Sequence, residues 1–141
     1  MLTLTTKKYE VEEPIKATNE NEETVYEFIM QLTSEEVKRI NEIIINTNDF
    51  KKAKKMAKLD VLSEEYEKLE QEMTDDAVKH QEELENICFK DHKEPFKTAV
   101  GEYKYLEMVE MIFDFFWNAF IEKKAKRANT MTSGLRKIGG Q

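Results

Sequence analysis

The spacing of apolar residues changes near Thr33, and this change constrains the fold more than any other feature of the chain. Over Thr24–Leu32 every second residue is apolar, which is typical of a strand with one buried face. This face carries Tyr26, Phe28, Met30 and Leu32, and the other face carries Val25 and Ile29. After Thr33 apolar residues recur every three or four positions, as they do on one side of a helix. The sequence therefore predicts an α+β fold that is mostly helical, in which an N-terminal β-hairpin precedes a helical body of three to four helices.

The length of 141 residues favours one domain, which we divide into three parts. Residues 1–32 form the hairpin, with extended segments at Lys8–Ala17 and Thr24–Leu32 and a polar turn at Asn19–Glu22. Pro14 lacks an N–H, so the first strand is expected at an edge or interrupted there. Residues 33–127 form the helical body, and residues 128–141 are expected to be a flexible basic tail.

Two helices have clear signals. Thr33 and Glu36 have the spacing of a capping box, which predicts a helix start at this point. A long helix is predicted further on, because apolar residues step by three or four positions over more than twenty residues. This seam consists of Leu62, Tyr66, Leu69, Met73, Ala77, His80, Leu84 and Ile87. A break between helices is expected at Asp91–Pro95, after the long helix.

Aromatic residues are concentrated in Tyr105–Ile121, which reads YLEMVEMIFDFFWNAFI. One helical stripe is expected to be buried, formed by Leu106, Val109, Ile112, Phe113, Phe116, Phe120 and Ile121. Further apolar side chains lie outside this stripe, more than one small core covers, so the segment is predicted to bind a partner. The candidate partner-binding residues are Met108, Met111, Ile112, Phe115, Phe116, Trp117 and Phe120.

This segment is not expected to span a membrane, because it contains Glu107, Glu110 and Asp114. The N-terminus has no apolar core and no cleavage site of a secretory signal. We therefore expect the protein in the cytoplasm.

Charge is unevenly distributed along the chain. Residues from Glu122 onward carry six Lys or Arg against one Glu, a net charge of +5, so the overall charge of −7 leaves −12 on the preceding residues. Such an acidic body repels nucleic acid, and the basic end has no aromatic residues to stack on bases. We expect no nucleic-acid partner.

No motif in the sequence predicts catalysis, a cofactor site or a metal site. The single cysteine, Cys88, is expected to be a small buried side chain. His80 lies in the apolar seam without the paired Glu-x-x-His motifs of a di-iron bundle, and His92 is expected in a loop. The chain is therefore expected not to be an enzyme, and no catalytic, cofactor-binding or metal-binding residue is predicted.

The N-terminal third carries the segments YEVEEPIK and EETVYEFIMQLTSEEVKRI, separated by a polar turn. In this third the chain resembles the opening of tail assembly proteins of tailed bacteriophages, in which a β-hairpin leads into a capped helix. The resemblance rests on Tyr9, Val11, Pro14, Ile15, Val25, Tyr26, Phe28, Leu32, Thr33 and Val37.

The resemblance implies a tail assembly chaperone in the host cytoplasm. Such a protein holds the long, helical tape-measure protein and recruits tail subunits. Genes of this family often yield a longer product by ribosomal frameshifting.

Three functions remain open at this point. The first is a chaperone that binds a helical client through the aromatic segment. The second is a homo-oligomeric structural or adaptor protein in which copies of the chain cover this surface for one another. The third is an acidic, phage-encoded inhibitor of a host nucleic-acid-binding protein, favoured only by the charge of the body.

Overall fold

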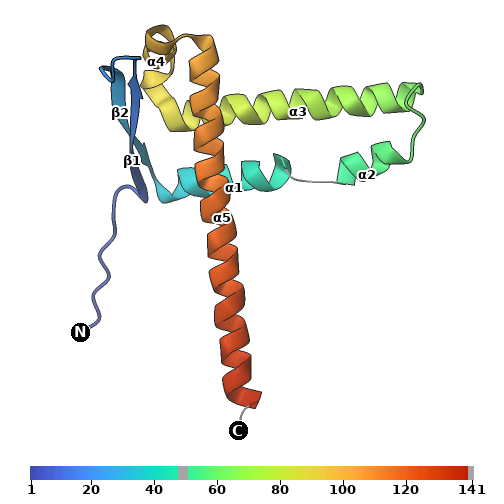
Figure 1. Ribbon diagram of the computed structural model, residues 1–141. Coiled ribbons are helices and arrows are strands. Elements are labelled where there is room, and N and C mark those ends of the chain that lie inside the picture. Colours follow the sequence, from blue (N-terminus) through green and yellow to red (C-terminus); the bar gives the residue numbers. More distant parts are fainter. Residues whose placement is uncertain (48–50, 140–141) are drawn as a thin grey trace. The chain divides into compact units, whose positions relative to one another are not determined.

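The computed structural model describes residues 1–47 and 51–139, and it confirms the predicted α+β class (Figure 1). The chain forms two compact units, Met1–Tyr105 and Leu106–Gln141. The elements are β1 (Val11–Thr18), β2 (Thr24–Leu32), α1 (Ser34–Thr47), α2 (Lys51–Ala57), α3 (Glu64–Phe89), the 3₁₀ helix η1 (Lys90–His92), α4 (Lys93–Val100) and α5 (Glu102–Gly139).

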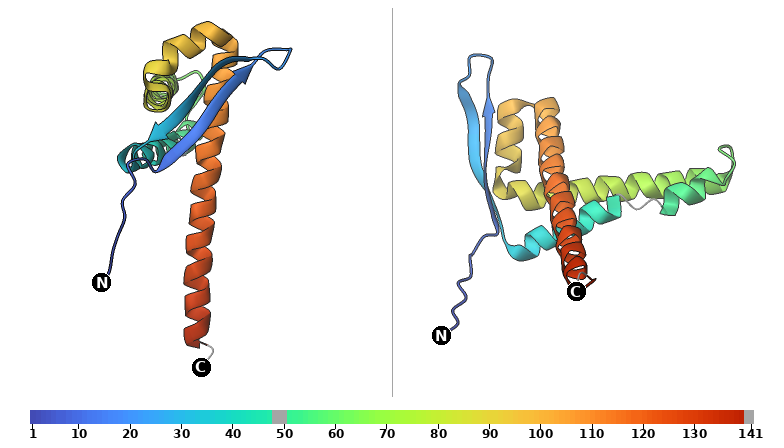
Figure 2. Two further views of the ribbon diagram at one scale, coloured as in Figure 1. Left: turned by 90° about the vertical axis from the view of Figure 1, so that its left-hand side faces the viewer. Right: turned by 60° about the horizontal axis from the view of Figure 1, so that its bottom comes forward.

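The hairpin has the predicted faces. β1 and β2 pair antiparallel, with Ile15 opposite Phe28 and Pro14 opposite Ile29. Phe28 and Ile15 are buried, whereas Ile29 is 55% exposed on the outer face. Within the described residues β1 pairs only with β2, so it is an edge strand and Pro14 interrupts no second ladder. Figure 2 shows the two strands as a twisted ribbon.

The polar turn of the hairpin is closed by Asn19. Its side-chain Oδ1 accepts hydrogen bonds from the backbone N–H groups of Asn21 and Glu23, at 2.9 and 3.0 Å. Glu22 adopts φ 61°, a left-handed conformation that the turn requires. The predicted turn at Asn19–Glu22 is thus confirmed.

The capping box at the start of α1 is also confirmed. Thr33 N–H donates to Glu36 Oε1 at 2.9 Å, and Glu36 N–H donates to Thr33 Oγ1 at 3.2 Å. Two backbone groups that the helix leaves without partners are satisfied in this way. The helix then buries Ile40, Ile43 and Ile44.

Helix α3 matches the long helix predicted from the apolar seam. Ser63 caps its start by accepting a hydrogen bond from Tyr66 N–H. Helices α1 and α2 run beside α3 (Figure 1), and Lys52 of α2 pairs with Asp76 of α3 at 2.8 Å. Burial is concentrated at the C-terminal end of α3, whereas Leu62, expected in the seam, is 89% exposed before the helix begins.

An aromatic cluster forms the core of the first unit. Phe28 of β2 contacts Phe89 of α3, and Phe89 contacts Phe96 of α4 and Tyr105 of α5, with ring centroids 5.1–5.6 Å apart. All four rings are less than a tenth exposed. Burying side chains of this size contributes about 1.5–3 kcal/mol each, so the cluster fixes the hairpin against the end of α3.

Helix α4 occupies part of the segment where a break between helices was expected. Pro95 is its third residue, within the first turn, where a helix makes no use of the backbone N–H. The break itself is confined to η1 and to Gly101, which adopts φ 87° and ends α4.

Helix α5 continues through Gly139, so residues 128–139 of the segment expected to form a flexible basic tail are helical. The segment contains no proline and several good helix formers, and Gly134 costs only about 1 kcal/mol relative to alanine in a helix. Residues 140–141 lie outside the described part of the chain.

Candidate protein-binding surface on α5

The least exposed side chains of α5 form a narrow stripe. Tyr105, Val109, Ile112 and Phe116, spaced four, three and four residues apart, are 1–6% exposed. Leu106 and Ile121 were expected in this stripe but are 44% and 45% exposed. The position of Tyr105 at the start of the helix determines which side of α5 is buried. Leu106 and Ile121 lie outside this buried side and are therefore exposed.

Beside this stripe lies a row of exposed apolar side chains, Met111, Phe115 and Ala119, which we call the apolar row. Its members are four residues apart and therefore follow one another along the helix surface. Met111 is 62% exposed and Phe115 is 41% exposed, and Ala119 is exposed as well. Met108 borders the row and is half-buried.

The other predicted partner-binding residues lie elsewhere on the helix. Ile112 and Phe116 belong to the stripe and are 3% exposed, so they offer little surface in this conformation. Trp117 and Phe120 lie on the opposite flank, half-buried, with their rings stacked at 6.3 Å and Lys124 over the Phe120 ring. Among the seven predicted residues, Met111 and Phe115 are therefore the two whose side chains are exposed.

A row of polar residues runs next to the apolar row. Glu110, Asp114, Asn118 and Glu122, again four residues apart, are all exposed, and we call them the acidic row. Residues three apart are neighbours on a helix, so Met111 lies beside Asp114 and Phe115 beside Asn118. Between Tyr105 and Glu122 the helix carries no Lys or Arg.

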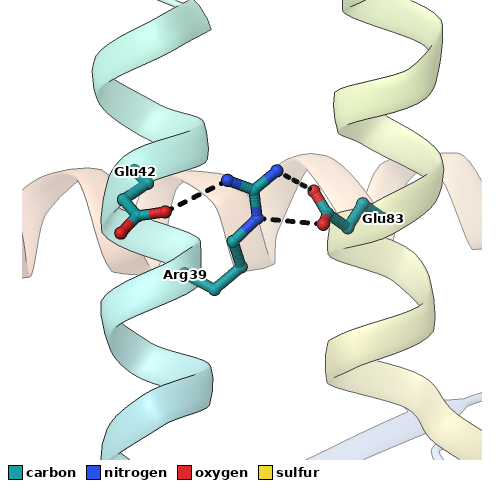
Figure 3. A network of polar contacts seen from close by, with 3 residues as sticks. All are labelled: Arg39, Glu42 and Glu83. Carbon is teal, nitrogen blue, oxygen red and sulfur yellow. Dashed lines mark hydrogen bonds and ion pairs between the residues drawn. The ribbon is translucent and has the colours of Figure 1, made fainter.

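A second surface feature is an open groove between α1 and α3. Arg39 of α1 binds Glu83 of α3 with two hydrogen bonds, at 2.6 and 2.9 Å, and binds Glu42 at 3.1 Å (Figure 3). These bonds raise the pKa of the Arg39 guanidinium, and the bonds from Arg39 lower the pKa of the Glu83 carboxyl.

The charges of this groove are balanced within the protein. It encloses about 670 Å³ and is lined by Glu36, Arg39, Lys79, His80, Glu82, Glu83, Asn86, Ile87 and Lys90. Lys90 donates to Glu36 at 3.1 Å and to the backbone oxygen of Gln31 at 2.6 Å. Burial alone would raise the pKa of Glu36, but the bonds from the Thr33 N–H and from Lys90 lower it. This network stabilises the packing of α1 on α3 and leaves little charge to attract a ligand.

Two long-range polar contacts, one buried and one half-buried, were not predicted from the sequence. The Tyr105 hydroxyl donates a hydrogen bond to the buried carboxylate of Glu85. The same carboxylate lies 3.9 Å from the Lys93 ammonium. Burial and this bond raise the pKa of the Tyr105 hydroxyl. His92 stacks on Phe28, and its Nδ1 lies 2.7 Å from the Tyr26 hydroxyl. The partners are 20 and 66 residues apart, and no local spacing indicates such pairs.

The remaining chemistry-bearing residues lie in structural positions. Cys88 is 2% exposed, as expected, and burial raises the pKa of its thiol to about 12, so it is a poor nucleophile. His80 faces the groove, half-buried. Within residues 1–47 and 51–139 no cluster of three or more His, Cys, Asp or Glu side chains has the arrangement of a metal site.

None of the helices in the described part of the chain combines the length and the apolar character that crossing a bilayer demands. The chain matches no family model, no curated protein and no solved structure.

Proposed function

We propose that this protein is a non-enzymatic assembly factor that holds a helical segment of another polypeptide on the apolar row of α5. The observation that carries the proposal is the exposure of Met111 and Phe115, at 62% and 41%, on adjacent turns of one helix. Large side chains in such a row are the anchors by which one helix docks against another.

The position of the row on a regular helix supports this function. A helix holds side chains at fixed intervals, so a partner helix meets a preformed surface and little conformational entropy is lost on binding. The row belongs to the second unit, whereas the buried aromatic cluster lies in the first. Loss of Met111 or Phe115 is therefore expected to leave the core of the first unit intact.

The hairpin and the capping box support a narrower proposal, a phage tail assembly chaperone. The residues that carry the resemblance include Ile15, Phe28 and Leu32, which are buried, and Thr33, which caps α1. On this proposal the clients are the helical tape-measure protein and tail subunits. A gene position between a tail-tube gene and a long tape-measure gene is the expected context.

Binding of a designed peptide tests the general proposal. The probe is a labelled, uncharged helical peptide of about 18 residues, long enough to be helical in water, with leucine at every fourth position. Fluorescence anisotropy is expected to show binding by the wild-type protein. Phe115→Ser and Met111→Ser remove exposed anchors and are each expected to weaken binding by about tenfold, equivalent to about 1.4 kcal/mol.

The matched control is Val78→Ser, which removes an apolar side chain that is 60% exposed on α3. It is expected to leave binding unchanged. Equal weakening by Val78→Ser and Phe115→Ser would contradict a specific surface on α5. Sedimentation of the protein alone distinguishes the homo-oligomeric alternative, since copies that cover the row for one another dissociate in the Phe115→Ser variant.

A further inference from the structure

We infer that the helix held by α5 carries lysine or arginine residues in a row beside its own apolar row. This inference rests on the proposed function and adds the chemistry of the partner. It is drawn from the acidic row, which runs along one edge of the apolar row over three turns of the helix.

Charge on α5 is arranged unfavourably for an isolated helix. Glu110 and Asp114 are four residues apart, a spacing at which like charges destabilise a helix by about 0.2–0.5 kcal/mol. No Lys or Arg lies three or four positions from either residue. Neither carboxylate forms an ion pair with any residue that the structure describes.

The geometry of helix packing places a partner's side chains between the two rows. Rows of residues four apart form ridges, and the groove between adjacent ridges receives a ridge of the facing helix. A partner ridge of apolar residues beside Met111 and Phe115 brings its neighbouring ridge over Asp114 and Glu110. Cations in that neighbouring ridge relieve the repulsion on α5 and form ion pairs at the edge of the interface.

The acidic edge ends at a defined point along α5. Basic residues begin again at Lys123 and Lys124, directly after Glu122. A partner helix with cations along its entire length is therefore attracted by the carboxylates over Glu110–Glu122 and repelled by the basic residues that follow them. This boundary sets where the basic row of the partner ends.

Three peptides test the inference. They share one leucine row and differ only in the adjacent row, which is lysine, glutamine or glutamate. Affinity for the wild-type protein is expected to fall in the order lysine, glutamine, glutamate. Two surface ion pairs at about 0.2–1 kcal/mol each predict that the lysine peptide binds about 2- to 30-fold more tightly than the glutamine peptide.

Variants of the acidic row separate local charge from net charge. Glu110→Gln combined with Asp114→Asn is expected to abolish the preference for the lysine peptide over the glutamine peptide. The control is Glu65→Gln combined with Glu72→Gln, which changes the net charge by the same amount at exposed positions of α3. This control is expected to retain the preference.

The outcomes distinguish the inference from the proposed function. Equal binding of all three peptides would overturn the inference and leave the proposed function standing. Binding of none of them would overturn both. A preference for lysine that disappears equally in the α3 control would also overturn the inference, since net charge alone would then account for it.

Discussion

The pairing of Tyr105 with Glu85 places a carboxylate in the core beside a phenol. Glu85 is 8% exposed, and Tyr105 is 1% exposed. A buried carboxylate is costly unless its oxygens accept hydrogen bonds, so the Tyr105 hydroxyl satisfies a group that the fold has taken out of water.

Removal of this hydroxyl is therefore expected to destabilise the protein. Tyr105→Phe keeps the ring in the aromatic cluster and removes the hydroxyl donor of the carboxylate, which retains the longer contacts with Gln81 Nε2 at 3.4 Å and the Lys93 ammonium at 3.9 Å. The expected cost is about 1–3 kcal/mol in the free energy of unfolding. Urea denaturation measures this cost. Tyr103→Phe is the control, because Tyr103 is 75% exposed, and a cost for Tyr105→Phe as small as that of the control would contradict the role of the bond.

The ion pair of Arg39 with Glu83 predicts a dependence of stability on pH. The pKa of Glu83 is lowered from its ordinary value of 4.5, so its contribution is present above that pH and is lost as the pH falls through the folded-state pKa. Glu83→Gln is expected to be less stable than wild type at neutral pH, and this difference is expected to shrink as the medium is acidified below 4.5.

Urea denaturation at neutral and acidic pH measures the change. Glu82→Gln alters an exposed neighbour on α3 and controls for the loss of one negative charge. A difference between wild type and Glu83→Gln that is the same at both pH values would show that the ion pair does not contribute to the acid sensitivity.

At the scale of elements, β2 places adjacent apolar residues on opposite faces of the hairpin, one buried and one exposed. Phe28 is 8% exposed in the aromatic cluster, and Ile29 is 55% exposed on the outer face. Phe28→Ala is expected to cost about 3–5 kcal/mol of unfolding free energy, whereas Ile29→Ala is expected to stay within about 0.5 kcal/mol. Thermal or urea denaturation of both variants tests the register, because a shift by one residue would exchange the two values.

The hairpin, α1 and α3 were predictable because their signals are local. Alternation along Thr24–Leu32 and the spacing of Thr33 and Glu36 each fix a conformation within a few residues. The sequence does not predict α4, because Pro95 indicates a break between helices, although the first turn of a helix accepts proline.

For the candidate surface, the sequence located the segment but not which of its sides is exposed. Seven residues were predicted, and they extend around most of the helix. Which side of α5 is buried depends on Tyr105, whose position is fixed by contacts with Glu85 and Phe89 from another helix. Such long-range contacts leave no mark in the local spacing, so Leu106 was wrongly assigned to the buried stripe.

At the scale of the whole molecule, the protein combines a first unit with its own aromatic core and a second unit that presents an apolar row. Negative charge dominates the chain up to Ile121, and an overall charge of −7 opposes nonspecific association of copies. An exposed apolar row on an acidic protein is suited to holding a partner segment while remaining dispersed.

The central claim, that the apolar row of α5 holds a helical partner, is tested most directly by NMR of methionine methyl groups. The chain has seven methionines, among them Met111 on the row, Met30 at 1% exposure in the core and Met56 on α2. Titration with the lysine peptide is expected to shift or broaden the Met111 signal while the Met30 and Met56 signals stay in place. An unchanged Met111 signal at saturation, or a shift at Met56 in its stead, would contradict the account.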